Sequence, residues 1–227
     1  MTQIAENGTE YHQIGLYSLN NGQVSQLTHS LDRNEISKEP AWSPDGRYLA
    51  FTTREKALLD NSKYVTNIHL IELATLERFK LERDDELAYG ARYPNWMPSE
   101  NYVIGWAVSD NNSYELNQIF FDLEWINRVP TLTQLPIVFR HVWSDLVWGA
   151  NGDWIVYTTS NSEKWRVSET GDDAVEIVVA PINLYSLLSD NSSQNEVIVD
   201  LSDNLYRIFE FLTDNQYIEN YVDWTPE

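Results

Sequence analysis

The chain has 227 residues, of which 42% are hydrophobic, with nine Trp, 13 Tyr, no Cys and a formal net charge of −20 at pH 7. Without Cys it has no disulfide framework, no thiolate metal site and no cysteine nucleophile. The negative charge repels phosphate backbones and anionic membrane surfaces, so we expect no nucleic acid partner, while a basic partner or a bound cation is allowed.

No apolar run reaches the roughly 18 residues that a membrane span needs, and residues 1–15 lack the basic and apolar regions of a signal peptide. We therefore expect a soluble chain with no membrane insertion. The compartment stays unknown: the chain as written is cytoplasmic, and it is periplasmic or extracellular if it is a fragment of a longer protein.

The first predicted elements are two short strands, residues 14–19 and 23–27, joined by Asn20-Asn21-Gly22. The Asn-Gly pair favours a tight hairpin, because both residue types tolerate the positive φ angles that such a turn requires.

The next element is a hairpin marked by a Trp, with the sequence AWSPDG at residues 41–46. Asp45 can accept a hydrogen bond from its own downstream backbone, and Gly46 tolerates positive φ. The following strand alternates through residues 48–53. Two more strands, 67–73 and 77–82, complete a four-stranded unit over residues 40–83.

The Trp motif recurs at Trp96 and Trp148 and, cut short, at Trp224, at intervals of 54, 52 and 76 residues. Such recurrence is typical of repeat architectures. It predicts further four-stranded units at 93–134 and 145–201, with Gly152 in the turn of the latter.

The third interval is long, and we attribute its length to an extra strand at 174–179, placing the regular strands at 182–187 and 196–201. Residues 203–220 favour a helix and a strand equally. Terminal strands are expected at 14–27 and 221–226.

The motif at Trp42 resembles the TolB-type, WD-like propeller repeat, which is also found in the propeller domains of prolyl oligopeptidase-like peptidases. The resemblance implies an all-β fold, a single β-propeller over residues 1–227 built of four-stranded antiparallel blades. Three blades are complete and the terminal strands are partial. The motif is architectural, so the resemblance implies no catalytic residues.

The termini do not complete a fourth blade, since the second strand of that blade is lacking. Propellers normally close because closure removes exposed edges. We favour a chain that is a segment of a larger propeller. The alternative is an open array whose edges are covered by pairing with another chain.

The candidate residues fall into two groups. A structural role in the repeat is expected for Trp42, Asp45, Gly46, Trp96, Trp148, Gly152 and Trp224, since residues at equivalent repeat positions pack similarly. The Trp residues outside that register are candidates for a binding surface: Trp106, Trp125, Trp143 and Trp165.

No catalytic, cofactor or metal residues are assigned. The sequence has no Gly-x-Ser-x-Gly nucleophile turn, and its four histidines, His12, His29, His69 and His141, show no metal-ligand spacing. Acidic clusters leave a Ca²⁺ site open, although none has EF-hand spacing. They are 84–86, 110–112 and 172–173.

Our leading hypothesis is a non-enzymatic propeller module that binds a protein or peptide through the loops 54–63, 84–92 and 161–173, because loops often carry function. One alternative is a propeller hydrolase or lyase acting on a carbohydrate or cationic substrate. Another is the regulatory propeller portion of a larger peptidase-like protein.

Overall fold

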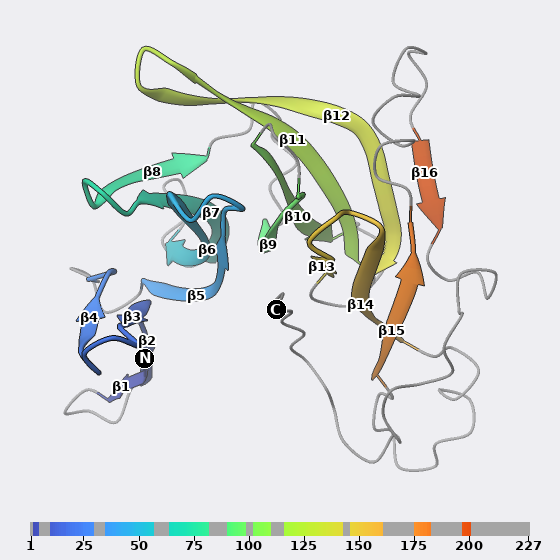
Figure 1. The fold of residues 1–227 in the computed structure, drawn as a ribbon. Helices are drawn as coiled ribbons and strands as arrows, with labels where there is room; N and C mark the ends of the chain where they lie inside the picture. The colour runs from blue at the N-terminus through green and yellow to red at the C-terminus, as the bar shows by residue number, and fades with distance from the viewer. Residues whose placement is uncertain are drawn as a thin grey trace. The chain divides into compact units, whose positions relative to one another are not determined.

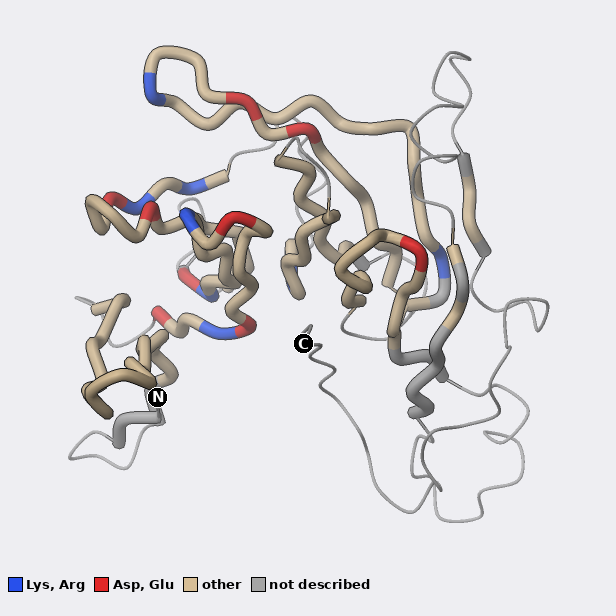
Figure 2. Tube along the Cα trace, in the orientation of Figure 1, with Lys and Arg blue, Asp and Glu red and all other residues tan. Residues whose placement is uncertain are grey.

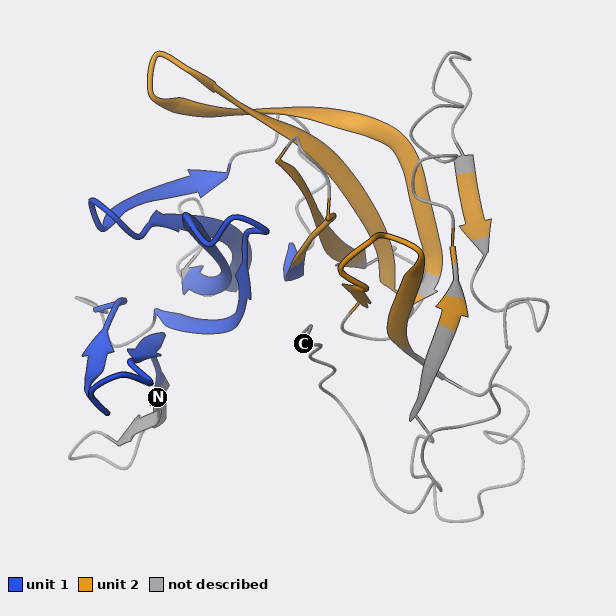
Figure 3. Ribbon diagram, in the orientation of Figure 1, with its two compact units in different colours: residues 1–94 blue, residues 95–227 orange. Residues whose placement is uncertain are grey.

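The protein is described by a computed structural model that covers residues 2–4, 10–29, 35–56, 64–81, 90–98, 102–109, 116–142, 146–160, 175–182 and 197–200. These residues form strands and turns with no helix among them, so the predicted all-β class is confirmed for them. The chain divides into two compact units, unit 1 (residues 1–94) and unit 2 (residues 95–227), each taken by itself below (Figure 3).

The described residues of unit 1 form two small strand pairs and one four-stranded sheet (Figure 1). The small pairs are antiparallel: β1 (Thr2–Ile4) with β2 (Glu10–His12), and β3 (Gly15–Tyr17) with β4 (Val24–Gln26). The larger sheet follows chain order: β5 (Ile36–Trp42), β6 (Tyr48–Lys56), β7 (Tyr64–Glu72) and β8 (Glu77–Leu81). Its four strands span Ile36–Leu81, where the sequence predicts a four-stranded unit over residues 40–83.

The core of unit 1 joins this sheet to the β3–β4 hairpin. Leu49, Phe51 and Ile71, which are at most 2% exposed, pack with Ile14, the residue just before β3. Thr28 closes the base of the hairpin, since its hydroxyl accepts from Ile14 N at 2.8 Å and donates to Gln13 Oε1 at 2.8 Å. The hairpin therefore covers the apolar part of one face of the sheet.

The turn between β5 and β6 has the geometry that its sequence predicts. Gly46 has φ of 69° and donates its N–H to Ser43 O at 2.9 Å. The Asp45 carboxylate accepts from the downstream Arg47 N–H at 3.1 Å and from the Ser43 hydroxyl at 2.8 Å. Local sequence alone thus specifies this reversal.

The β3–β4 hairpin is looser than the predicted tight turn. Ser18 N–H donates to Gln23 O at 2.8 Å, so four residues form the loop. Of these four, only Gly22 has positive φ, at 70°. Asn21 instead uses its side-chain oxygen, which accepts from Gln23 N–H at 3.0 Å, to stabilise the turn.

The part of unit 2 that the structure describes forms two sheets (Figure 1). The first has the order β16-β12-β11-β10-β9, where β9 spans the boundary between the units. Its strands are β9 (Arg92–Trp96), β10 (Val103–Ser109), β11 (Leu116–Ile126), β12 (Val129–Val142) and β16 (Val197–Asp200). The second is a three-stranded meander of β13 (Leu146–Trp148), β14 (Trp154–Ser160) and β15 (Val175–Pro181).

The core of unit 2 fills the space between its two sheets and is rich in aromatic rings. Phe120 lies edge-on to Phe139 at 5.1 Å and to Trp148 at 6.1 Å between ring centroids. Gly105 allows this packing, since a Cβ at this position would come within 2.4 Å of the Phe120 ring. A larger residue at 105 would force the ring to move.

The three predicted repeats share two backbone hydrogen bonds, although their sequences differ. In each repeat the residue after the motif Trp donates to the carbonyl at the start of the next strand: Ser43 to Tyr48, Met97 to Val103 and Gly149 to Trp154, at 2.8–3.0 Å. In a second hydrogen bond, an N–H group in or just after the third strand of the repeat donates to the carbonyl of the residue just before the second strand. The three examples are Leu73 to Arg47, Leu123 to Tyr102 and Ile182 to Asp153, at 2.8–2.9 Å. Shared bonds in three places show structural repetition.

The structure corrects the predicted third repeat. Its third strand is β15, which includes most of the segment predicted as an insertion, and Ile182 only follows that strand. The predicted fourth strand, 196–201, corresponds to β16, which pairs in parallel with β12 of the other sheet. The reason is that strand pairing depends on distant partners, which the local pattern does not specify. Residues 203–220 and 221–226 lie outside the described residues.

Candidate functional site

The most elaborate polar arrangement in the described part of unit 1 lies on one face of the β5–β8 sheet. Because side chains alternate along a strand, residues two apart share a face. The register therefore gathers on this face the polar side chains of Ser37, Thr53, Glu55, Asn67, His69, Arg78 and Lys80.

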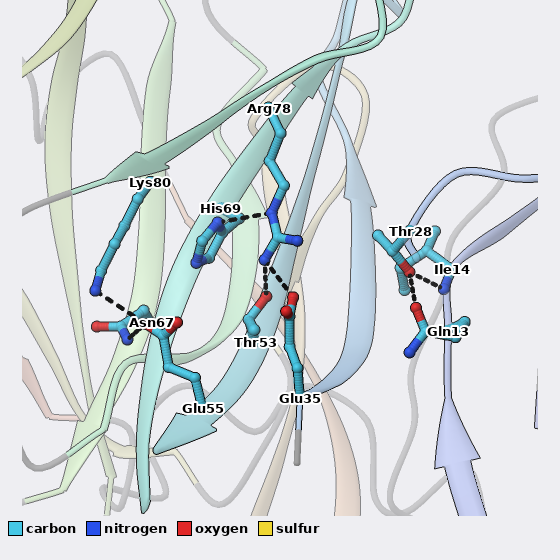
Figure 4. Close-up of polar contacts among 10 residues, drawn as sticks. All are labelled: Gln13, Ile14, Thr28, Glu35, Thr53, Glu55, Asn67, His69, Arg78 and Lys80. Atoms are coloured by element: carbon cyan, nitrogen blue, oxygen red, sulfur yellow. Dashed lines mark hydrogen bonds and ion pairs between the residues drawn. The ribbon is translucent and has the colours of Figure 1, made fainter. Parts of the chain in front are cut away.

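Arg78 is the centre of this arrangement (Figure 4). Its guanidinium, on β8, donates to His69 Nδ1 at 2.9 Å and to the Thr53 hydroxyl at 3.2 Å. It also pairs with the Glu35 carboxylate at 2.6 Å and lies over the Phe51 ring, 5.3 Å from its centroid. One cation thus connects three strands and the residue before β5.

His69 is held in a single charge state. It is 6% exposed, and burial, followed by the nearby charges of Arg78 and Lys80, lowers its pKa to about 3. Because Nδ1 accepts from Arg78, the neutral ring carries its proton on Nε2. Nε2 has no hydrogen-bond partner within the described ranges.

A second group on the same face involves Glu55, which accepts from Lys80 Nζ at 2.9 Å and from the Asn67 amide (Figure 4). Lys80 and Glu55 are about one third exposed, so water weakens this ion pair. The pair forms the solvent-facing side of the polar face.

Glu39 forms a separate buried contact in unit 1. Its φ is 57°, at an irregularity in the β5–β6 pairing. The side chain is 7% exposed and accepts from the Thr52 hydroxyl at 2.5 Å, from Tyr93 N–H at 3.0 Å and from Arg92 at 3.4 Å. The carboxylate therefore fixes the start of β9 to the β5–β6 hairpin.

The chemistry of the polar face is that of hydrogen-bond donation. The His69 Nε2–H and the hydroxyl of Ser37, which is 1% exposed, have no partner among the residues that the structure describes. Each can donate to an oxygen acceptor. In the same ranges no group of His, Asp and Glu side chains has an arrangement that could hold a metal ion.

The motif Trp residues occupy different environments. Trp96 and Trp148 are 7% and 6% exposed, whereas Trp42 is 51% exposed. The Trp148 indole donates to Asn95 Oδ1 at 3.3 Å, and Asn95 in turn donates to Gln118 Oε1 at 2.9 Å. These two hydrogen bonds connect the two sheets of unit 2. Trp224 is outside the described residues.

The four Trp residues expected on a binding surface are not brought together in the described ranges. Trp106 is 1% exposed and stacks on Phe121 with ring centroids 4.2 Å apart, inside the packing of its sheet. Trp125 is half-buried near the tip of β11. Trp143 and Trp165 lie outside the described residues, so a binding role for the group stays a prediction.

Most of the predicted loops and acidic clusters also lie outside the described residues, including 84–86, 110–112 and 172–173. Of the histidines, only His69 belongs to the polar network printed in Figure 4. The contacts of Arg78 were not predictable from the spacing of the histidines. The alternation of Glu77, Arg78, Phe79, Lys80 and Leu81 was the available signal, since it places two cations on one face of β8.

In the described residues no helix has both the length and the apolar character needed to cross a membrane. No protein-family model matches the chain, and no curated protein matches it.

Solved structures give distant similarities. The chain is similar to dipeptidyl peptidase 4 from Porphyromonas gingivalis, with 10% identity and a TM-score of 0.45 over 78% of this chain and 30% of that one. It is similar to the tricorn protease, with 9% identity and a TM-score of 0.45 over 79% and 21%. An oligogalacturonate lyase in complex with manganese has 12% identity and a TM-score of 0.34 over 88% and 62%. The chain thus spans 30% or less of the first two proteins.

Proposed function

We propose that this chain is a β-propeller-type module, related to TolB-like repeats, that binds a protein or peptide partner without catalysing a reaction. The repeated turn hydrogen bonds support the propeller, because they recur in three successive antiparallel meanders. The packing of one sheet face against the next element within each unit also supports it.

The observation that carries the binding function is the hairpin of β11 and β12. The two strands pair from Leu116↔Val142 to Ile126↔Val129, while β10 pairs with β11 only as far as Asp122. From the pair Asp122↔Thr133 to the tip the hairpin forms a ribbon, here defined as residues 122–133, which is two-stranded beyond this pair (Figure 1). Its tip exposes Ile126 and Val129 by 52% and 60%. Exposed apolar side chains on such a projection favour contact with another protein.

The test is a cross-linking survey with the full chain, in parallel with turnover assays on peptide and oligosaccharide substrates. We expect specific cross-links from the ribbon to a protein partner and no turnover. Turnover of a defined substrate together with no ribbon cross-link would overturn the proposal in favour of the hydrolase or lyase alternative.

A further inference from the structure

The outer edge of β12 differs along its length. Its C-terminal part, Ile137–Arg140, pairs in parallel with β16, which comes from nearly 60 residues later in the chain. Its N-terminal part pairs with β11 on one side and with no described strand on the other. The same strand edge therefore already accepts an added strand at one end.

The backbone direction at the open part follows from one hydrogen bond. Leu123 N–H donates to Tyr102 O at 2.8 Å, away from β12. Leu132 lies opposite Leu123, and in an antiparallel pair both residues then direct their backbone groups away from each other. Leu132, and Gln134 two residues later, therefore present N–H and C=O groups along the outer edge of β12.

Two prolines delimit this edge. Pro130 and Pro136 both lie in β12 and lack an N–H group. Proline at an edge strand limits pairing with other chains. Here the prolines leave Thr131–Leu135 between them as the segment able to pair.

The two faces of the ribbon differ in chemistry. One face carries Leu123, Trp125, Pro130 and Leu132, which the pairing places side by side. The other carries Asp122 and Glu124 beside Thr133 and Thr131. Burial raises the pKa of Asp122, and repulsion by the Glu124 carboxylate raises it further. A cation near this face would therefore stabilise both carboxylates.

The charge of the surrounding unit has the same sign. Of the net charge of −20, unit 1 accounts for −4 and unit 2 for −16, because unit 2 has only five Lys and Arg residues against 21 Asp and Glu. Figure 2 shows acidic positions along the ribbon and a basic position at its tip. Arg128 lies in the turn between β11 and β12. A partner strand with basic side chains would meet a favourable field.

We propose that the segment Thr131–Gln134 of β12 binds an extended strand of a partner protein in which apolar and basic side chains alternate. The partner's backbone pairs with Leu132 and Gln134, as in other cases of strand addition to a sheet edge. Its apolar side chains lie beside Leu132, and its basic side chains lie on the face of Asp122 and Glu124. This inference rests on the proposed binding function and names the site and the partner's chemistry.

The experiment measures binding of fluorescent peptides to the full chain by anisotropy. The probe is a short peptide in which Val and Lys alternate, and its control has the same composition in two blocks. We expect the alternating peptide to bind about tenfold more tightly than the block peptide, since only the former matches both faces. Equal binding of the two peptides would overturn the proposal and indicate non-specific attraction to an acidic protein.

The matched variants are Gln134→Pro, which removes one outward N–H, and Gln134→Ala, which removes the same side chain and keeps that N–H. Gln134 is exposed, so both changes remove a side chain that is not part of the core. We expect about a tenfold loss for Gln134→Pro and no change for Gln134→Ala. Equal affinities of the two variants would contradict the edge site.

A second variant keeps the test valid if Gln134→Pro perturbs the fold. Glu124→Lys reverses a charge on an exposed side chain, and we expect several-fold weaker binding that depends less on salt. An unchanged affinity would count against the proposed face. If Gln134→Pro still cross-links to the chain's protein partner, the edge site is wrong while the binding function stands.

Discussion

In unit 1 a polar network crosses the face of the sheet, whereas in unit 2 aromatic rings fill the space between two sheets. Arg78 of unit 1 has an anion, a hydroxyl and an imidazole as partners, and its unit carries a net charge of only −4. Unit 2 packs Phe120, Phe139 and Trp148 together and carries most of the negative charge. We therefore expect the stability of unit 1 to respond to pH and to the loss of paired charges. We expect the stability of unit 2 to respond to the volume of its core side chains.

The largest expected effect tests the core of unit 2. Phe120→Ala removes a ring that is fully buried between Phe139 and Trp148, and we expect the free energy of unfolding to fall by about 3–5 kcal/mol. Urea denaturation measures it. The control is Ile126→Ala at an exposed position of the same strand, which should change stability by about 0.5 kcal/mol or less. Similar losses for both variants would show that the core is not where unit 2 gains its stability.

The next effect tests the polar face of unit 1 through pH. His69 has a folded pKa of about 3, lowered from 6.5, so below pH 6.5 the unfolded chain binds a proton that the folded chain does not. The contribution to stability is then fully present well above pH 6.5 and falls towards pH 3, by about 2 kcal/mol between pH 7.5 and 5.

The comparison is between the wild type and His69→Gln in urea denaturation at pH 7.5 and pH 5. We expect the variant to lose less stability over this interval, since Gln has no proton to gain. The matched control His29→Gln, at an exposed position, should keep the wild-type dependence. An unchanged pH dependence in His69→Gln would contradict the buried neutral imidazole.

A smaller effect tests whether the turns of the two units are equivalent. Gly46 and Gly152 have φ of 69° and 72° and make the same hydrogen bond, to Ser43 O and Gly149 O. Changing either to Ala should cost about 1–2 kcal/mol, because the left-handed backbone strains a Cβ. Gly46→Asn should cost less, since Asn tolerates this region. Thermal denaturation gives the comparison, and a cost at only one turn would argue against a shared repeat.

The smallest effect tests the exposed edge of the polar face. Lys80→Gln removes the ion pair with Glu55, and we expect a loss of about 0.5 kcal/mol or less that vanishes in high salt. Denaturation at low and high ionic strength measures it. A loss that persists in high salt would contradict a solvent-exposed ion pair between Lys80 and Glu55.

Local chemistry made part of the fold predictable. The Asp45-Gly46 turn and the strands β7 and β8 follow from neighbouring residues, and they are found close to where the pattern places them. The turn of β11 and β12 was not predictable in this way. Asn127 and Arg128 have φ of 53° and 69° without a glycine, because pairing along both long strands outweighs the local preference.

The candidate site was less predictable than the fold. Arg78 and His69 are nine residues apart, while Thr53 and Glu35 lie much earlier in the chain. The register of β6, β7 and β8 brings Thr53, His69 and Arg78 together. Spacing of His residues could indicate a metal site but not a neutral imidazole held by an arginine. The partners of Arg78 are recognised only when the strand register is known.

The sequence alone determined the all-β class, the recurring Trp motif and the reversals at Gly46 and Gly152, because turn geometry and strand alternation depend on residues close in the chain. The tertiary structure decided which Trp is buried, how far β12 extends and which strand β16 pairs with. These features depend on contacts between distant segments, where the pattern of one strand is compatible with several partners.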